Sequence, residues 1–342
     1  MDVLPKDRRI GLVRKFAAVV VASAIVIGLA ACSDLPAQVQ GCQTDYSNGT
    51  AAKAITATGA IGQNPKAKVP TPTLTKKVEV ATTKTGSGLL LGKGDIADVT
   101  VTLYTGADGK AADSTGYGRS KAVQVAVGDT STTLPTIFAK SLMCETVGSR
   151  VTTVMTAAQF YGSASSATSN DVDPKTVVIG VTDIVKGYRG RAVGTLAPLK
   201  SGFPSVVTSP DGTPGVTLDL QEPPKTLQSE VVRAGSGQVV KKGQRVLLQV
   251  QGIAWTDPAP TTTFDSTWTS HAPRYYTLTA LKKDSAGYSL DAGSVKSLVG
   301  QRVGSQVLVV VPAKDGYPSG KSPSGYPTKE TLIFVYDILG VY

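Results

Sequence analysis

Histidine and cysteine, which often bind metals or act in catalysis, are scarce in this sequence. His271 is the single histidine among 342 residues, which excludes a histidine-rich metal site, and no GxSxG segment supplies the serine of a Ser-His-Asp triad. Residues 320–322 read GKS, but Asp315 stands where a phosphate-binding loop needs glycine. Asp171 and Asp173 precede a proline and are interpreted as a solvated turn rather than a calcium site. These residues therefore indicate neither a histidine-based metal site, nor a serine hydrolase, nor a phosphate-binding loop.

Aromatic side chains are the remaining candidates, at 6% of the chain, and the elements that must position them occur in two copies. Residues 86–188 and 235–342 carry the same short motifs in the same order. These motifs are GSG at 86–88 and 235–237, DST at 113–115 and 265–267, KSL at 140–142 and 296–298, VGS at 147–149 and 303–305, and a last strand at 175–184 and 329–338. A repeat of about 150 residues is far longer than a solenoid period, so it indicates a duplicated domain.

Alternating apolar and polar residues predict about five strands in each copy. The expected strands cover residues 78–81, 98–104, 121–127, 147–156 and 177–185 in the first copy, and 227–232, 245–252, 274–279, 303–311 and 331–339 in the second. Helical periodicity is limited to residues 136–143 and roughly 294–299. One short helix between the third and fourth strands of a sheet is an α+β plan.

The first 31 residues resemble an export signal. Five basic residues precede an apolar run at 16–31, which at about 1.5 Å of rise per residue is too short for a hydrocarbon core of about 30 Å. The run ends in a lipobox-like LAAC, so Cys32 is predicted to become a lipidated N-terminus that holds the protein at the extracytoplasmic face of the cell membrane. A free cysteine after an ordinary cleavage site is the alternative, and Arg8 and Arg9 leave twin-arginine export as a weaker one.

Two further cysteines follow the predicted signal. Cys42 and Cys144 of an exported chain are expected to pair, with two free thiols as the alternative.

The net charge of the chain is modest. It falls from +10 to +7 when the signal, with its five basic and two acidic residues, is removed. The positive charges form no cluster with aromatic residues, so nucleic-acid binding is not expected. Residues 32–64 are predicted to be a tether with one strand near 54–60, and the Pro- and Gly-rich residues 191–214 a linker.

The second copy resembles the FKBP family of peptidyl-prolyl isomerases. The resemblance covers nearly all of residues 225–342 and rests on the segments GSGQVVKKGQRVLLQVQG, TFDSTW, LVGQRVGSQVLVVVPAKDGYP and TLIFVYDILGV. It implies two FKBP-like domains, a degenerate one at 65–190 and a second at 215–342, each a twisted antiparallel sheet wrapped on one short helix. The layout as a whole resembles an actinobacterial FKBP-type lipoprotein.

The resemblance also implies a pocket between helix and sheet in the second copy. Phe264, Asp265, Tyr317 and Phe334 match family pocket positions, and Trp268 is expected to add aromatic surface nearby. An apolar pocket disfavours the dipolar planar amide relative to the twisted transition state, whose barrier in water is about 18–20 kcal/mol. The resemblance thus implies a reaction that needs no nucleophile, no metal and no cofactor.

Neither copy keeps the complete family pattern. In the second copy Val250 and Ser294 replace two aromatic residues. The first copy is expected to keep a pocket remnant made of Tyr104, Asp113, Phe138 and Tyr161, with Ala112 and Gly180 where two Phe residues would stand.

We therefore expect an isomerase of X-Pro bonds in exported polypeptides, with the second copy the active one. A non-catalytic binding or chaperone module with degenerate pockets is the alternative. A solute-binding lipoprotein is disfavoured, because it would need strands alternating with long helices. The sequence does not predict the oligomeric state, the client proteins or binding of macrolides.

Overall fold

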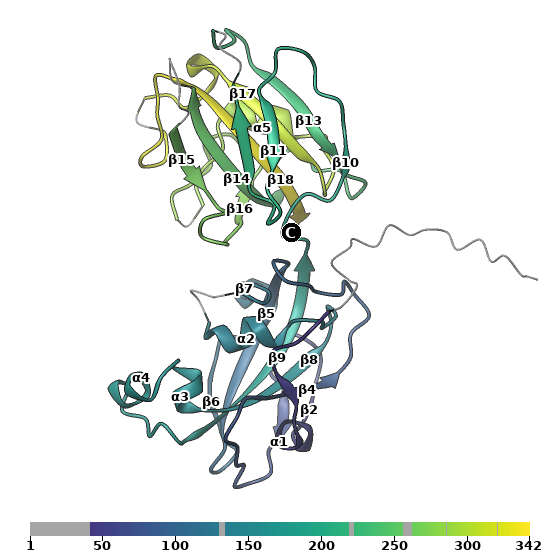
Figure 1. Ribbon diagram of the computed structural model, residues 1–342, viewed down its shortest axis with the longest axis vertical. Coiled ribbons are helices and arrows are strands. Elements are labelled where there is room, and N and C mark those ends of the chain that lie inside the picture. The colour runs from purple at the N-terminus through teal and green to yellow at the C-terminus, as the bar shows by residue number, and fades with distance from the viewer. Residues whose placement is uncertain (1–41, 130–133, 219–221, 256–261, 285, 320) are drawn as a thin grey trace, which may run out of the picture. The chain divides into compact units, whose positions relative to one another are not determined.

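The computed structural model describes residues 42–129, 134–218, 222–255, 262–284, 286–319 and 321–342 (Figure 1). The predicted signal and Cys32 lie outside these residues. All described residues belong to one compact unit, Pro36–Tyr342. Within the described residues no helix is both long and apolar enough to cross a bilayer.

Two seven-stranded sheets contain most of the secondary structure, and they share one strand order. The first runs β1-β4-β8-β9-β5-β6 with β7 also on β5, and the second runs β10-β13-β17-β18-β14-β15 with β16 also on β14. The first sheet comprises β1 (Ser47–Asn48), β4 (Glu79–Lys84), β5 (Ile96–Thr105), β6 (Ala111–Ser114), β7 (Val123–Ala126), β8 (Arg150–Thr156) and β9 (Val177–Tyr188). The second comprises β10 (Thr195–Leu196), β13 (Gln228–Ala234), β14 (Arg245–Trp255), β15 (Thr262–Ser266), β16 (Arg274–Thr277), β17 (Gln306–Val311) and β18 (Thr331–Val341).

The two sheets also share their irregularities. The register of β5 on β9 shifts between Asp98 and Val99, and that of β14 on β18 shifts between Leu247 and Leu248. Because a register shift changes which face every later side chain occupies, matching shifts give the two sheets matching faces. The duplication read from the motifs is therefore also present in the strand pairing.

Short helices and two small hairpins complete the described structure. The helices are α1 (Thr50–Ala54), α2 (Thr136–Ser141), α3 (Ala157–Phe160), α4 (Ala164–Ser169) and α5 (Ala292–Leu298), with 3-10 turns η2 (Arg119–Lys121) and η3 (Ala313–Asp315). The hairpins pair β2 (Thr56–Thr58) with β3 (Lys66–Lys68), and β11 (Ser205–Thr208) with β12 (Pro214–Thr217). Helices α2 and α5 occupy the places predicted for one helix in each copy.

Each sheet is buried on both faces. One face of the second sheet packs with α5 in a core that includes Val295, Leu298 and Phe334. Its other face buries Ile253, Leu308 and other apolar residues under side chains of residues 199–218. The central strands are therefore almost continuously apolar and buried, as β14 and β18 show, rather than alternating as the sequence patterns predict.

The segments expected to be a tether and a linker carry structure. Within residues 42–64, β1 pairs with β4, and a disulfide joins Cys42 to Cys144 across 102 residues. In the chain-entropy model, closing a loop of this size stabilises the fold by about 4–5 kcal/mol at most. Within residues 191–214, β10 pairs with β13 and β11 forms its hairpin with β12.

Candidate functional site

Phe264, Tyr317 and Phe334 converge in the second sheet, around Tyr326. The ring of Tyr326 lies 4.7 Å from Phe264, 5.6 Å from Tyr317 and 6.5 Å from Phe334, measured between centroids. Phe264 and Phe334 also meet edge to face at 5.6 Å. The three aromatic residues predicted to share a pocket therefore do lie together, and Tyr326, which the sequence reading missed, occupies the space between them.

The strands explain why the rings meet. Phe264 lies on β15 and Phe334 on β18, the strands that pair with β14 at Gly252, and both flank that glycine. A Cβ atom on Gly252 would lie 2.8 Å from the Phe264 ring and 3.1 Å from the Phe334 ring. Gly252 therefore makes room for the edge-to-face pair.

Asp265 is buried and held by two donors. Arg274 of β16 donates to both carboxylate oxygens of Asp265, at 2.7 Å and 2.8 Å, and the Tyr326 hydroxyl donates to the same carboxylate. Burial raises the pKa of Tyr326 above its usual range, so its hydroxyl remains a donor. The bidentate ion pair with Arg274 holds the Asp265 carboxylate in one position in the wall of the site. The carboxylate in turn fixes the hydroxyl group of Tyr326.

Tyr317 is fixed in a similar way. Its hydroxyl donates to the carbonyl of Ser289 at 2.5 Å, and burial raises its pKa above the usual range. The floor of the cluster is also tyrosine: Tyr336 of β18 stacks on Phe334 at 5.4 Å and donates to Ser294 Oγ on α5 at 2.9 Å. Ser294 is a small residue where the family has an aromatic one, and the ring of Tyr336 on β18 supplies the aromatic volume instead.

A cavity of about 810 Å³ opens beside this cluster. Phe264 connects the two, because its half-buried ring packs on the aromatic core and also lines the cavity with Asp265, Arg274 and Tyr288. Tyr317 and Phe334 do not line this cavity. Of the three predicted aromatic residues, Phe264 is therefore the one that a ligand in this cavity would contact.

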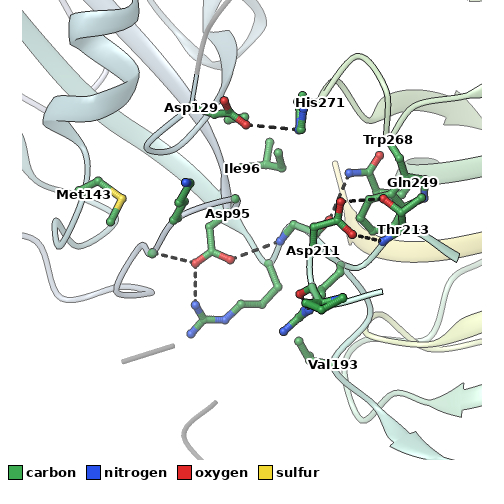
Figure 2. Close-up of a pocket in the computed structure, with 18 of the residues that line it drawn as sticks. Asp95, Ile96, Asp129, Met143, Val193, Asp211, Thr213, Gln249, Trp268 and His271 are labelled. Atoms are coloured by element: carbon green, nitrogen blue, oxygen red, sulfur yellow. Dashed lines mark hydrogen bonds and ion pairs between the residues drawn. The ribbon is translucent and has the colours of Figure 1, made fainter. Parts of the chain in front are cut away.

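Trp268 lies apart from the cluster. It lines a different cavity of about 620 Å³ together with Thr213, Gln249 and His271, which Figure 2 labels. A Cβ atom on Gly212 would lie 2.9 Å from the Trp268 ring, so this indole packs against the backbone of residues 209–213. The expectation that Trp268 adds aromatic surface to the pocket of Phe264 is wrong, because its side chain points into another part of the molecule.

The remnant expected in the first copy is not assembled. Tyr104 packs with Ile55 and Ile179, and its hydroxyl donates to the Pro65 carbonyl, whereas Phe138 on α2 belongs to a different core. The strand pairing explains this, since Leu103 holds the place of Gly252 and Val101 the place of Val250. Placing Tyr104 at the pocket shifted the match by three residues, and an odd shift moves a side chain to the opposite face.

Of the other three residues of that remnant, Asp113 lies apart, whereas Phe138 and Tyr161 both contact Phe160, with 6.2 Å between the ring centroids of Phe138 and Phe160. Asp113 is exposed on β6, because Val123 stands on β7 where Arg274 stands on β16. Phe138 fills the space above Gly180, whose added Cβ would lie 2.3 Å from its ring. Tyr161 contacts Phe160 at 4.9 Å between centroids, rather than an enclosed pocket.

Comparison with known proteins finds similarity in sequence and in structure. No family model matches the chain. It is 29% identical over 129 residues to an FK506-binding protein of Streptomyces anulatus, covering 96% of that protein and 37% of this chain.

Two solved structures contain similar parts. FkpA from Escherichia coli is 25% identical with a TM-score of 0.28, over 42% of this chain and 52% of FkpA. The three FKBP domains of wheat FKBP73 are 13% identical with a TM-score of 0.31, over 78% of this chain and 94% of that one. The sheet-rich fold with few helices is consistent with an FKBP-like fold, and the sequence match gives this chain FKBP-type homology at low identity.

Proposed function

We propose that residues 225–342 form a peptidyl-prolyl cis-trans isomerase site that acts on X-Pro bonds of exported polypeptides. The observation that carries the proposal is the convergence of Phe264, Tyr317 and Phe334 beside an open cavity, in a chain with FKBP-type homology. Isomerisation of X-Pro bonds takes tens to hundreds of seconds unaided, so a folding chain outside the cytoplasm benefits from a catalyst.

The chain's own residues supply an apolar surface rather than a reactive group. The pyrrolidine ring would pack on Phe264 at the inner end of the cavity, against the ring of Tyr326 behind it. Removing water from the amide favours the twisted, less dipolar transition state. Arg274 and Asp265 neutralise each other, so this pair presents little net charge to the amide.

The test is the isomerisation rate of a Leu-Pro peptide, measured by NMR exchange with the full-length chain. Burial of a Phe side chain contributes about 1.5–3 kcal/mol, so Phe264→Ala is expected to lower kcat/KM roughly tenfold to a hundredfold. Phe160→Ala, which removes a half-buried Phe from the first copy, is the matched control and should leave the rate unchanged. Equal rates for the two variants would remove the proposal.

The second candidate is a module that binds proline-containing segments without turning them. Tyr326 favours it, because its ring fills the centre of the aromatic cluster and its hydroxyl is held by Asp265. Peptide binding measured by fluorescence anisotropy, with no change in the isomerisation rate, would leave this candidate alone.

We also propose that the chain is anchored at the cell envelope through a lipid on Cys32. The basic residues, the apolar run and the LAAC segment support this. Labelling of the wild-type chain with radioactive palmitate, absent in Cys32→Ala, tests the anchor. Recovery of both proteins in the soluble fraction, unlabelled, would overturn it.

A further inference from the structure

The charge around the cavity beside Phe264 is uneven. Four basic residues line it, Arg245, Arg274, Lys282 and Lys283, against two acidic ones, Asp265 and Asp284. Arg274 is already paired with Asp265 through two hydrogen bonds. The remaining lining charges are three positive and one negative.

The two lysines are free to meet a ligand. Lys282 and Lys283 are both exposed, and among the described residues no ion pair involves either of them. Asp284 beside them is held by the backbone N–H groups of Ala286 and Tyr288, each at 2.9 Å. Within the part of the chain that the structure describes, its carboxylate forms no ion pair with either lysine.

Arg245 extends the positive side of the cavity. Its guanidinium lies 4.4 Å from the ring centre of Tyr275 and 4.6 Å from that of Tyr342, so stacking fixes its position. Phe264 and Tyr288 provide the apolar part of the same cavity, with Arg274 lying 3.7 Å over the Tyr288 ring. One cavity thus combines an aromatic surface suited to a proline ring with a cationic margin.

From this charge pattern we infer that the site selects proline segments flanked by acidic residues. The inference rests on the proposed function, and names the substrate class of the same site. Glutamate or aspartate beside the proline would meet Lys282 and Lys283 while the ring packs on Phe264. Attraction between exposed charges is weak in water, of order 1 kcal/mol per pair at 4 Å, so the preference is modest and falls with salt.

The experiment compares three peptides that share a central Leu-Pro and carry Glu-Glu, Gln-Gln or Lys-Lys on both sides. Binding to the full-length chain is measured by anisotropy, and isomerisation by NMR exchange, at low and high salt. We expect the Glu-Glu peptide to bind about three- to tenfold more tightly than the Gln-Gln peptide at low salt. The Lys-Lys peptide is expected to bind most weakly.

Charge reversal supplies the critical variant. Lys282→Glu with Lys283→Glu should abolish the preference for the Glu-Glu peptide over the Gln-Gln peptide or invert it. Lys241→Glu with Lys242→Glu makes the same change of net charge at an exposed pair outside the cavity, and should keep the preference. Matching thermal unfolding curves confirm that the variants are folded.

The outcomes separate this inference from the proposed function. Isomerisation of all three peptides with equal binding would overturn the acidic preference and leave the isomerase intact. A Glu-Glu preference lost only in the Lys282 and Lys283 variant, without any rate enhancement, would uphold the preference and remove catalysis. If the variant instead loses binding to anionic phosphatidylglycerol vesicles while the peptides bind alike, the cationic margin serves a lipid surface and the inference is wrong.

Discussion

Each sheet packs against a short helix, and the aromatic side chains at this contact lie on the helix in the first copy and on the strand in the second. In the first, Phe138 on α2 fills the space above Gly180 of β9. In the second, α5 carries Ser294, and β18 carries Phe334 and Tyr336 instead. Packed cores tolerate such exchanges when the total volume is kept. In the second arrangement the strand-borne ring of Phe334 contacts Phe264, which also lines the cavity of about 810 Å³.

The same comparison holds for one buried carboxylate in each sheet. Asp183 of β9 pairs with Arg150 of β8, whose guanidinium donates to it at 2.6 Å and 2.7 Å. At the matching places Asp337 has Gln306, which donates one hydrogen bond of 2.8 Å. Burial therefore raises the pKa of Asp337 to about 6. One acidic position is thus held by a cation in one sheet and by an amide in the other.

The largest loss of stability is expected when Arg150 is replaced by glutamine, the residue type that Gln306 supplies at the matching place in the second sheet. Arg150→Gln leaves Asp183 buried without its cation and frees the carbonyls of Ala57 and Ala60, to which Arg150 also donates. Breaking a buried pair in this way costs about 3–5 kcal/mol, to be measured as the free energy of unfolding in urea. The exposed Arg302→Gln should change it by about 0.5 kcal/mol or less. Similar losses for both would mean that the pair contributes little.

A pH dependence is expected from Asp337. Its folded-state pKa of about 6 exceeds the ordinary 3.8, so the folded chain binds this proton more tightly than the unfolded chain. The resulting stability is complete below about pH 4 and is lost as the pH rises through 6, by roughly 3 kcal/mol in all.

Asp337→Asn removes that loss, so the stability of this variant relative to wild type should rise between pH 4 and pH 7, as followed by urea unfolding across this range. The exposed Asp113→Asn serves as the control, and parallel pH profiles for Asp337→Asn and wild type would contradict the assignment.

A smaller difference is expected between Asp265 and its counterpart. Asp265→Asn loses charged hydrogen bonds from Arg274, which contribute about 1.5–3 kcal/mol each at most, so a net loss of roughly 2–3 kcal/mol is expected. Asp113→Asn should be nearly neutral, because that side chain is exposed. Calorimetric unfolding of the two variants checks the contrast, which fails if Asp113→Asn is the more harmful change.

The smallest effect concerns the tight contact of Gly180. Gly180→Ala brings a Cβ to 2.3 Å from the Phe138 ring and should cost about 1–3 kcal/mol by overpacking. In a Phe138→Leu background the same change should cost less, because the ring edge is gone. A double-mutant cycle measures this coupling, and additive losses would show that the two residues do not compete for space.

Much of this could be predicted from the sequence, because short motifs in constant order fix the strands and the helix of each copy. The convergence of Phe264, Tyr317 and Phe334 followed from the family resemblance. Tyr326 could not be predicted, because it lies in a loop that has no motif and whose path depends on contacts with Asp265 and Tyr317. Tyr104 was misplaced because a YTG triplet looks alike in either register, and only strand pairing decides which face it occupies.

The covering of the second sheet by residues 199–218 determines where the protein can be cut. A fragment that starts at Gly215 discards Leu199, Phe203 and Val206, and uncovers the apolar side chains of Ile253, Leu308 and Ile333. These side chains would then form a contiguous apolar patch on the sheet that is exposed to water, which promotes precipitation and self-association. A soluble C-terminal fragment must accordingly start near residue 191, ahead of β10.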